Sequence, residues 1–227
     1  MRVVSLVPSL TETLITLGVM PIACTRFCEQ PSIASVGGTK DPSIEAIVAL
    51  GPDVVFLDRE ENRREDADAL RAAGVEVFAT HVASIADVAE MIASVAERLG
   101  VASIDVSHQN LAVRSVRTAF VPIWRRPWMT INALTYASSL LESIGIANVF
   151  ANDAAVYPTM TLADAAALSP QMVLLPSEPY PFAPRHISEV GAALPDAEIH
   201  FVDGQDLFWW GVRTPLARQR LAAALAT

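Results

Sequence analysis

Lysine is almost absent from this sequence of 227 residues. Lys40 is the only one, and lysine and arginine together reach 16 against 25 acidic residues. The net charge of -9 leaves no broad basic surface to neutralise a phosphate backbone, so a nucleic-acid partner is not expected. No stretch approaches the roughly 18 consecutive apolar residues of a membrane-spanning helix. Because 52% of the residues are hydrophobic, the chain can still bury a core, and we expect a folded, acidic protein that is not inserted in a membrane.

Cysteine and histidine are also scarce. Cys24 and Cys28 are too few for a disulfide framework, and although their spacing suits two ligands on one helical face, metal sites usually need three or four. We expect two small buried thiols, with a metal or redox role as the alternative. The histidines have no partners at ligand spacing and are expected to be structural or surface residues; they are His81, His108, His186 and His200. No resident metal and no covalently bound cofactor are predicted.

The N-terminal segment lacks the features of an export signal. A strand pattern over 2–7 begins at once, with no apolar segment and no small-residue cleavage site before it. The sequence as written therefore predicts a cytoplasmic location. A missing leader would instead make the protein periplasmic or extracytoplasmic.

Short β-branched runs alternate with longer helical patterns along the whole chain, which is typical of an α/β protein with mostly parallel strands. Ser9 and Glu12 have the spacing of a capping box at a helix start, and Thr161 and Asp164 have a similar spacing in the second half. The predicted strands are 2–7, 54–57, 75–79, 119–123, 172–175 and 198–202.

An internal repeat supports a two-lobed organisation. Residues 44–55 align without a gap with residues 162–173, and each copy reads as a short helix, a proline and an apolar strand. We predict two Rossmann-like lobes with mostly parallel sheets, an N-terminal one over 1–101 and a C-terminal one over 118–227. A single connecting helix over 102–117 would join them; the alternative is an ordinary crossover helix within one sheet.

Four segments in this order resemble the helical-backbone solute-binding proteins of ABC importers, the class III group that receives vitamin B12 and iron-siderophores. They are R-V-V-S-L-V-P-S-L-T-E at 2–12, S-I-E-A-I-V-A-L-G-P-D-V-V at 43–55, A-A-G-V-E-V at 72–77 and A-L-S-P-Q-M-V at 167–173. The resemblance implies two α/β lobes that grip a small-molecule metal chelate, cobalamin-like or siderophore-like, in the cleft between them. It also implies that no chemistry is performed on the ligand.

The resemblance further implies an ABC permease as partner, contacted through one surface glutamate on each lobe. Glu45 stands at the first-lobe position. In the second lobe that position is Ala163, and Asp164 follows one residue later. A shift of one residue turns a helical side chain through about 100°, so Asp164 is a displaced candidate for permease docking.

Candidate ligand-binding residues lie in loops that follow predicted strands, because such loops line the ligand crevice of a parallel sheet. All four tryptophans fall in two of these loops, where flat rings suit a macrocyclic or catecholate ligand and arginines supply positive charge. The second-lobe candidates are Trp124, Arg125, Arg126, Trp128, Glu178, Tyr180, Phe182, Trp209 and Trp210. The first-lobe candidates are Phe27, Lys40, Glu60, Glu61 and Arg63. Alternatively, the tryptophans cap the core and 60–64 is a solvated helix start.

The leading hypothesis is non-catalytic binding of a metal chelate, as in the solute-binding protein of an ABC importer. A second hypothesis keeps the binding fold as a cytoplasmic chelate sensor or carrier without a role in transport. A third is an enzyme in which Glu60, Glu61 or Glu178 acts as acid or base beside Arg125 and Arg126. The sequence disfavours the enzyme because it has no dinucleotide-binding glycine motif, no P-loop and no nucleophile elbow.

Overall fold

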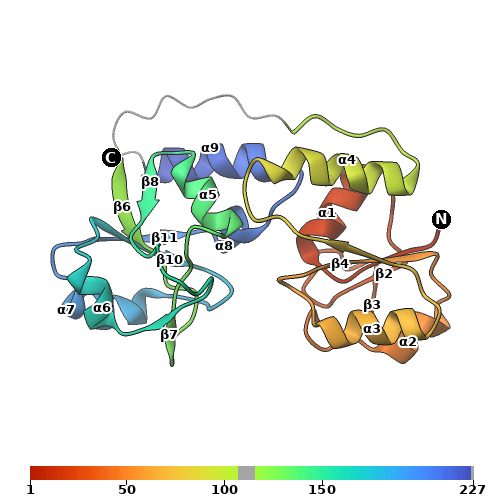
Figure 1. The fold of residues 1–227 in the computed structure, drawn as a ribbon, viewed down its shortest axis with the longest axis horizontal. Coiled ribbons are helices and arrows are strands. Elements are labelled where there is room, and N and C mark those ends of the chain that lie inside the picture. The colour runs from red at the N-terminus through yellow and green to blue at the C-terminus, as the bar shows by residue number, and fades with distance from the viewer. Residues whose placement is uncertain (107–115, 226–227) are drawn as a thin grey trace. The chain divides into compact units, whose positions relative to one another are not determined.

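The computed structural model describes residues 1–106 and 116–225, which fall into two compact units (Figure 1). Unit 1 consists of Met1–Val82, Asp87–Val106 and Trp210–Val212. Unit 2 consists of Ala83–Ala86 and the described parts of 107–209 and 213–227. Two short segments are thus exchanged relative to the contiguous lobes that we predicted, since 83–86 belongs to unit 2 and 210–212 to unit 1.

The helix that we predicted over 102–117 lies mostly outside the described residues, which omit 107–115. At its described ends, residues 102–106 and Val116 are not helical, and Arg117 begins a strand. The prediction is wrong at both of these ends.

Unit 1 is built on a five-stranded parallel sheet with the order β3-β2-β1-β4-β5. The strands are β1 (Val3–Ser5), β2 (Ala23–Cys24), β3 (Ala34–Ser35), β4 (Val54–Asp58) and β5 (Val77–Thr80). The helices are α1 (Pro8–Thr16), α2 (Ile44–Ala49), α3 (Arg64–Ala72) and α4 (Asp87–Leu99).

Helices cover both faces of this sheet: α2 and α3 lie on one, and α1 and α4 on the other (Figure 1). All five residues of β4 are therefore buried, as expected for a central strand of a parallel sheet. Successive strand side chains point to opposite faces. Val55 and Leu57 accordingly pack in one cluster with Ile47 of α2 and Leu70 of α3.

The capping box that we predicted at Ser9 and Glu12 does not form. The α1 helix begins at Pro8, with Val7 as an N-cap that makes no side-chain cap bond. Proline suits the first helical position because the N–H that it lacks would have no helical partner there. Ser9 is therefore already inside the first turn, where its carbonyl accepts a hydrogen bond from the Thr13 hydroxyl at 2.9 Å.

Unit 2 has a four-stranded parallel sheet with the order β11-β10-β6-β8 and a separate antiparallel pair, β7-β9. The strands are β6 (Arg117–Phe120), β7 (Trp128–Met129), β8 (Ile146–Asn148), β9 (Thr159–Met160), β10 (Met172–Pro176) and β11 (Glu198–Val202). The helices are α5 (Tyr136–Glu142), α6 (Leu162–Ala167), the 3-10 helix η1 (Pro184–His186), α7 (Ile187–Ala193), α8 (Gly204–Phe208) and α9 (Thr214–Leu225). Together, the two parallel sheets confirm the predicted α/β class.

The internal repeat is present in the structure, with matching element boundaries. Ser43 and Thr161 are the N-caps of α2 and α6, and each side chain accepts a hydrogen bond from the backbone N–H three residues on. The Thr161–Asp164 capping box is confirmed. Past each helix, Gly51 and Ser169 occupy aligned positions and both have positive φ, 55° and 47°. The repeated helix–proline–strand unit thus has the same backbone path in both units.

Candidate ligand-binding surfaces

Each sheet has one point where the strand order reverses direction. In unit 1 it lies between β1 and β4, and in unit 2 between β6 and β10. Chain segments that leave neighbouring strands at such a point diverge to opposite faces, and the crevice outside the carboxyl ends of the strands is where open α/β sheets bind ligands. The loops after these four strands are therefore the candidate surfaces of the two units.

In unit 2, the loops after β6 and β10 bring together five ring side chains, which we call the aromatic wall: Trp124, Trp128, Tyr180, Phe182 and His186. Trp124 meets Tyr180 edge-on, with ring centroids 5.6 Å apart. Trp128 stacks on Phe182 at 5.9 Å with an interplanar angle of 10°, and Tyr180 lies 4.8 Å from Phe182. The structure thus joins four of the predicted aromatic candidates in one cluster.

Exposure is graded across the aromatic wall. Phe182 is 6% exposed and packs in the hydrophobic core with Phe120, Val173 and Leu175. Trp124 is 44% exposed. The inner rings therefore complete the core, as the alternative interpretation expects, whereas Trp124 exposes ring surface to solvent and its contact with a ligand stays a prediction.

His186 fixes the orientation of Tyr180 within this wall. It is 3% exposed, and its Nδ1 accepts a hydrogen bond from the Ala183 N–H at 3.0 Å. Burial, followed by the charges of Arg185 and Arg125, lowers the pKa of His186, so the ring is neutral near pH 7. A neutral ring that accepts at Nδ1 carries its proton on Nε2, which lies 3.4 Å from the Tyr180 hydroxyl oxygen.

The two predicted arginines of the β6 loop differ in their surroundings. Arg125 is bound to Glu189 of α7 at 2.7 and 2.8 Å. Most of its positive charge is therefore matched within the protein. Arg126 is exposed and has a φ of 74°, a left-handed conformation that is uncommon for a residue with a side chain.

Glu178 lies two residues beyond β10 and is packed against the start of α8. A Cβ atom placed on Gly204 would come within 2.6 Å of the Glu178 backbone nitrogen, so only glycine fits there. The Ser177 hydroxyl accepts a hydrogen bond from the Gly204 N–H at 2.9 Å. This close approach fixes the base of the loop that carries Tyr180.

The remaining tryptophan pair is divided between the two units. Trp209 belongs to unit 2, and the Arg213 guanidinium covers one face of its ring at 4.6 Å. Trp210 belongs to unit 1 and is 6% exposed. Its neighbour Gly211 packs directly on Thr13 of α1, so the backbone at this point belongs to unit 1.

In unit 1, Asn62 links three loops at the carboxyl edge. Its Oδ1 accepts a hydrogen bond from the Asp58 N–H at 2.8 Å. Its Nδ2 donates to the Leu6 carbonyl at 3.1 Å and to the Thr39 carbonyl at 2.9 Å. Because Asn62 is 6% exposed, these bonds are shielded from competing water. One side chain thus ties together the ends of β1 and β4 and the loop after β3.

Asp58 extends this polar network. It is 2% exposed, and its carboxylate accepts hydrogen bonds from the Thr80 hydroxyl at 2.7 Å and the Glu60 N–H at 2.9 Å. Burial raises the pKa of Asp58, and the hydrogen bonds from Thr80 and Glu60 oppose that rise. Lys40 donates to the Glu60 carbonyl at 2.8 Å, so this predicted ligand residue also holds the loop in place.

The other unit 1 candidates are exposed. Glu60 has a carboxylate oxygen 3.8 Å from His81 Nδ1. Phe27 is 53% exposed, and the Arg26 guanidinium lies 4.8 Å from its ring centroid while also pairing with Asp41 at 2.9 Å. Glu61 and Arg63 are exposed in the segment before α3. The first-unit edge is therefore charged and hydrogen-bonded rather than aromatic.

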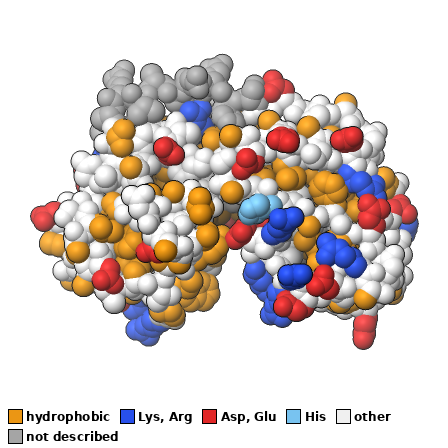
Figure 2. All heavy atoms as spheres, in the orientation of Figure 1, with side chains coloured by type: hydrophobic (Ala, Val, Ile, Leu, Met, Phe, Trp, Pro, Cys, Tyr) orange, Lys and Arg blue, Asp and Glu red, His pale blue; other side chains and the backbone are white. Residues whose placement is uncertain are grey.

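Figure 2 shows a similar contrast on one face of the molecule. Hydrophobic side chains gather over α6, α7 and β7 of unit 2, whereas basic and acidic side chains are intermixed over α3 of unit 1. The surfaces beside the two edges therefore also differ in composition.

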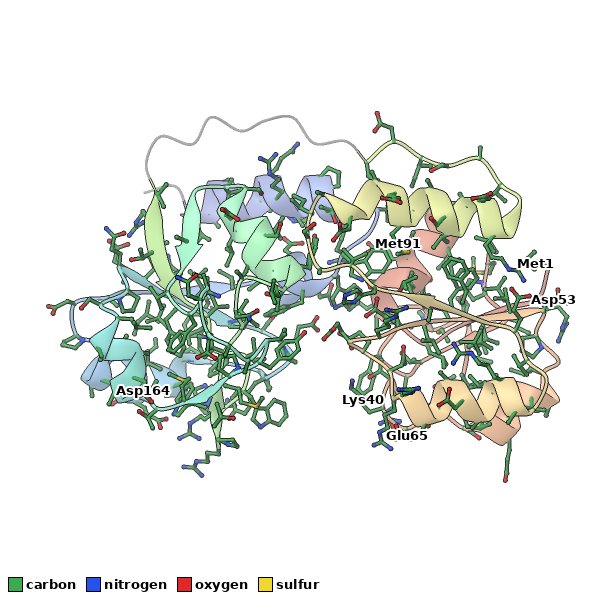
Figure 3. The ribbon with its side chains drawn as sticks, viewed as in Figure 1. Met1, Lys40, Asp53, Glu65, Met91 and Asp164 are labelled. Atoms are coloured by element: carbon green, nitrogen blue, oxygen red, sulfur yellow. The ribbon has the colours of Figure 1, made fainter. Side chains whose placement is uncertain are left out.

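The two residues predicted to dock a permease lie on equivalent helices. Glu45 is exposed in the first turn of α2. Asp164 is exposed on α6 (Figure 3), and its carboxylate accepts hydrogen bonds from the Thr161 N–H at 2.8 Å and the Thr161 hydroxyl at 2.7 Å. These bonds lower the pKa of Asp164. The Asp164 carboxylate therefore helps to cap its own helix, α6.

Sequence reasoning missed His186, Asn62 and Glu189, because each acts through tertiary contacts that no local spacing reveals. The described part of the chain contains no group of three or more histidine, cysteine or acidic side chains arranged to hold a metal ion. Of the helices within residues 1–106 and 116–225, none combines the length and hydropathy needed to cross a bilayer.

The family model for periplasmic binding proteins matches residues 3–123, more than half of the chain. The vitamin B12-binding protein of Vibrio parahaemolyticus is 27% identical over 194 residues, covering 76% of this chain and 69% of that protein. In fold, the chain is similar to the periplasmic vitamin B12 binding protein of Vibrio cholerae, with a TM-score of 0.79, 18% identity and coverage of 99% and 96%. It is also similar to the periplasmic heme binding protein of Vibrio cholerae, with a TM-score of 0.76, 18% identity and coverage of 100% and 99%.

The cytoplasmic location predicted from the N-terminal residues is wrong. The matched family consists of periplasmic binding proteins, and the similar solved structures named above are periplasmic. The first residues mislead because they belong to the strand β1 and give no information about export. The resemblance to solute-binding proteins of ABC importers is confirmed. On these grounds, the chain belongs to the periplasmic binding protein family.

Proposed function

We propose that this protein is a periplasmic solute-binding protein that binds a flat or macrocyclic metal chelate without changing it chemically. Cobalamin, haem and ferric siderophores are the ligand class, because the similar proteins include vitamin B12-binding and heme-binding members. An ABC permease would receive the chelate. The exposed Glu45 is the proposed docking residue on α2, and Asp164 is the weaker candidate on α6 because its carboxylate is engaged with Thr161.

The observation that carries this proposal is the aromatic wall at the strand-order reversal of unit 2. Trp124 is 44% exposed and held edge-on by Tyr180, so its ring surface is available in a fixed orientation. Flat rings bury large apolar areas at little cost in conformational entropy, which suits an extended conjugated ligand. Tyr180 in turn packs on Phe182, with ring centroids 4.8 Å apart, and Phe182 stacks on Trp128.

Tyr180 would supply a directed hydrogen bond to the ligand. Its oxygen lies 3.4 Å from His186 Nε2, which carries the proton of the neutral ring and therefore donates. Because the oxygen accepts from His186, the phenolic hydrogen is left to donate to an acceptor on the ligand. A carboxylate or amide oxygen on the periphery of the chelate would fit this position. Arg126 would add an exposed positive charge beside it.

The unit 1 edge would contribute polar contacts through Glu60, Glu61 and Arg63 and a ring contact through Phe27, on a frame fixed by Asn62 and Lys40. The polar contacts would depend on the rigidity of these loops. A frame that is already ordered loses little entropy on binding, so even weak polar contacts can add to affinity.

Isothermal titration calorimetry with cyanocobalamin, haemin and a ferric siderophore tests the proposal. We expect one of the three to bind at one equivalent with a Kd in the micromolar range or tighter. The Trp124→Ala variant should bind the chelate at least about 10-fold more weakly, because it removes a ring that the bound ligand would cover. The matched control is Leu168→Ala, which alters an exposed apolar residue, 46% accessible, at the opposite end of β10. Equal loss in both variants, or no binding of any chelate, would rule the proposal out.

A further inference from the structure

Cys24 and Cys28 are the one pair of thiols in the sequence, and the backbone brings them together. Cys24 ends β2, which is paired with β1 and β3. Directly after it, the Cys28 N–H donates to the Thr25 carbonyl at 3.1 Å, which closes a four-residue turn from Thr25 to Cys28. The chain therefore reverses within this turn and returns Cys28 to the end of β2.

Side-chain contacts hold Cys28 in that position. Its sulfur lies 3.2 Å from the Thr11 hydroxyl of α1 and 3.3 Å from the Thr25 hydroxyl. Cys24 points to the same side of the sheet, because its strand neighbour Ala23 packs in the opposite cluster with α2 and α3 and successive strand side chains alternate between faces. Both thiols therefore lie on the α1 side of the sheet, at the two ends of one tight turn.

The two thiols differ in accessibility. Cys24 is 2% exposed, and burial together with the charge of Cys28 raises its pKa to about 12. Cys28 is half-buried at the surface turn. An oxidant from solution would therefore reach Cys28 first, and Cys24 would act as the resolving thiol.

We propose that Cys24 and Cys28 form an oxidisable pair that closes to an intramolecular disulfide by exchange with a small-molecule disulfide or a thiol oxidant of the compartment. This proposal does not depend on chelate binding, although the turn also carries Phe27, a proposed contact residue. Its product would be a covalent ring over residues 24–28 that fixes the turn bearing Arg26 and Phe27, which form the exposed edge of unit 1 next to β2. An oxidising compartment such as the periplasm favours this state.

With oxidised glutathione as oxidant, the reaction has two balanced steps. The Cys28 thiolate attacks one glutathione sulfur, a mixed disulfide forms, and the first glutathione leaves as a thiolate that takes up a proton. Cys24 then loses its proton and attacks the Cys28 sulfur, so that the protein disulfide forms and the second glutathione leaves. Two protein thiols are oxidised, and one glutathione disulfide is reduced to two thiols.

Alkylation with mass spectrometry tests the proposal on the whole chain. The reduced protein is incubated with oxidised glutathione, unfolded in the presence of iodoacetamide and weighed. We expect the number of alkylated cysteines to fall from two to zero, with no glutathione adduct and a peptide mass lower by two hydrogens across 24–28. Reduction with dithiothreitol should restore both alkylation sites.

Two variants separate the roles of the thiols. Cys24→Ser should stop at a stable glutathione adduct on Cys28, and Cys28→Ser should leave Cys24 largely unmodified in the native state. If the wild-type protein keeps two alkylatable thiols, retains a glutathione adduct on Cys28, or forms only disulfide-linked dimers, the proposal is wrong. Chelate binding is measured on the reduced protein, so failure of either proposal leaves the other intact.

Discussion

The two units start from the same repeated element and end in different chemistry. Extending the gapless alignment of 44–55 with 162–173 along the chain pairs Glu60 with Glu178 and Asn62 with Tyr180. Asn62 uses its amide to bind three neighbouring loops, whereas Tyr180 lies in a cluster of rings beside a buried histidine. The repeated sequence therefore fixes the point at which each loop leaves its sheet. The residue four positions beyond the strand, Asn62 or Tyr180, determines whether the loop is held by hydrogen bonds or carries an aromatic cluster.

This difference also separates what stabilises each edge from what each edge can bind. In unit 2, the Trp124 ring that is proposed to meet the ligand contacts Tyr180, which packs against the core ring Phe182. In unit 1, the loops that carry the charged side chains are held by the buried hydrogen-bond network of Asn62 and Asp58. Substitutions should therefore affect the two edges through cavity formation in one case and through unpaired polar groups in the other.

The largest effect is expected from Phe182→Ala. Phe182 is 6% exposed in the core of unit 2, so its removal should lower the free energy of unfolding by about 3 to 5 kcal/mol through lost burial and a residual cavity. Phe27→Ala is the matched substitution in unit 1, and because that ring is 53% exposed the loss should stay below about 0.5 kcal/mol. Urea denaturation followed by circular dichroism measures both. Similar losses in the two variants would show that the edges do not differ in this way.

A smaller decrease in the free energy of unfolding is expected from Asn62→Ala. The change leaves the Leu6 and Thr39 carbonyls and the Asp58 N–H without the partner that each now has, which should cost about 2 to 3 kcal/mol. Lys40→Ala is the control in the same loops, since it removes one exposed bond to the Glu60 carbonyl and should cost less than about 1 kcal/mol. If Asn62→Ala were as mild as the Lys40 variant in denaturant titrations, the amide would not be holding the loops.

The smallest expected effect is on the pH dependence of the free energy of unfolding. His186 in unit 2 and Asp58 in unit 1 should change this dependence in opposite directions. His186 has a folded-state pKa below its ordinary value of 6.5, so the unfolded chain binds the proton more tightly. Its contribution to stability is present above pH 6.5 and is lost as the pH falls through the lower, folded-state pKa. In the non-titrating variant His186→Gln, the free energy of unfolding should fall less steeply with acidification in this range. A slope equal to that of the wild type would contradict the burial of a neutral ring.

In unit 1, Asp58 should make the free energy of unfolding depend on pH in the opposite direction. Its folded-state pKa lies above the ordinary value of 3.8, so the native state holds the proton more tightly. That contribution is present below pH 3.8 and is lost as the pH rises through the raised pKa. Asp58→Asn should remove this loss, and the same unfolding series between pH 3 and 7 measures it. A change of the same sign as in His186→Gln would show that burial does not dominate at Asp58.

The fold was largely predictable because its signals are local. The strand predicted over 198–202 coincides with β11, and the Thr161–Asp164 capping box forms because both residues lie within one turn. At the start of α1, two local signals compete: Ser9 favours a helix start as N-cap, and Pro8 favours one as the first helical residue. The helix begins at Pro8. The exchange of 210–212 into unit 1 could not be predicted, because it depends on Gly211 packing against Thr13, nearly two hundred residues away in the chain.

The candidate surfaces were predictable in part for the same reason. Position after a strand identified Trp124, Tyr180 and Phe182, since the carboxyl ends of parallel strands share one edge. It could not show that Arg125 is matched by Glu189 or that His186 lies beneath Tyr180, because those pairings arise from the packing of α7 and η1. Charge in a loop is visible in a sequence, whereas its neutralisation is not.

Amide hydrogen exchange with and without bound chelate tests the central claim most directly. We predict slower exchange in the loops that carry the aromatic wall, 121–130 and 177–183, and a lesser slowing in 58–63, with no change around α6 and α7 away from these loops. Protection that spares 121–130 and 177–183 while a chelate is bound would contradict the proposal that this wall receives the ligand.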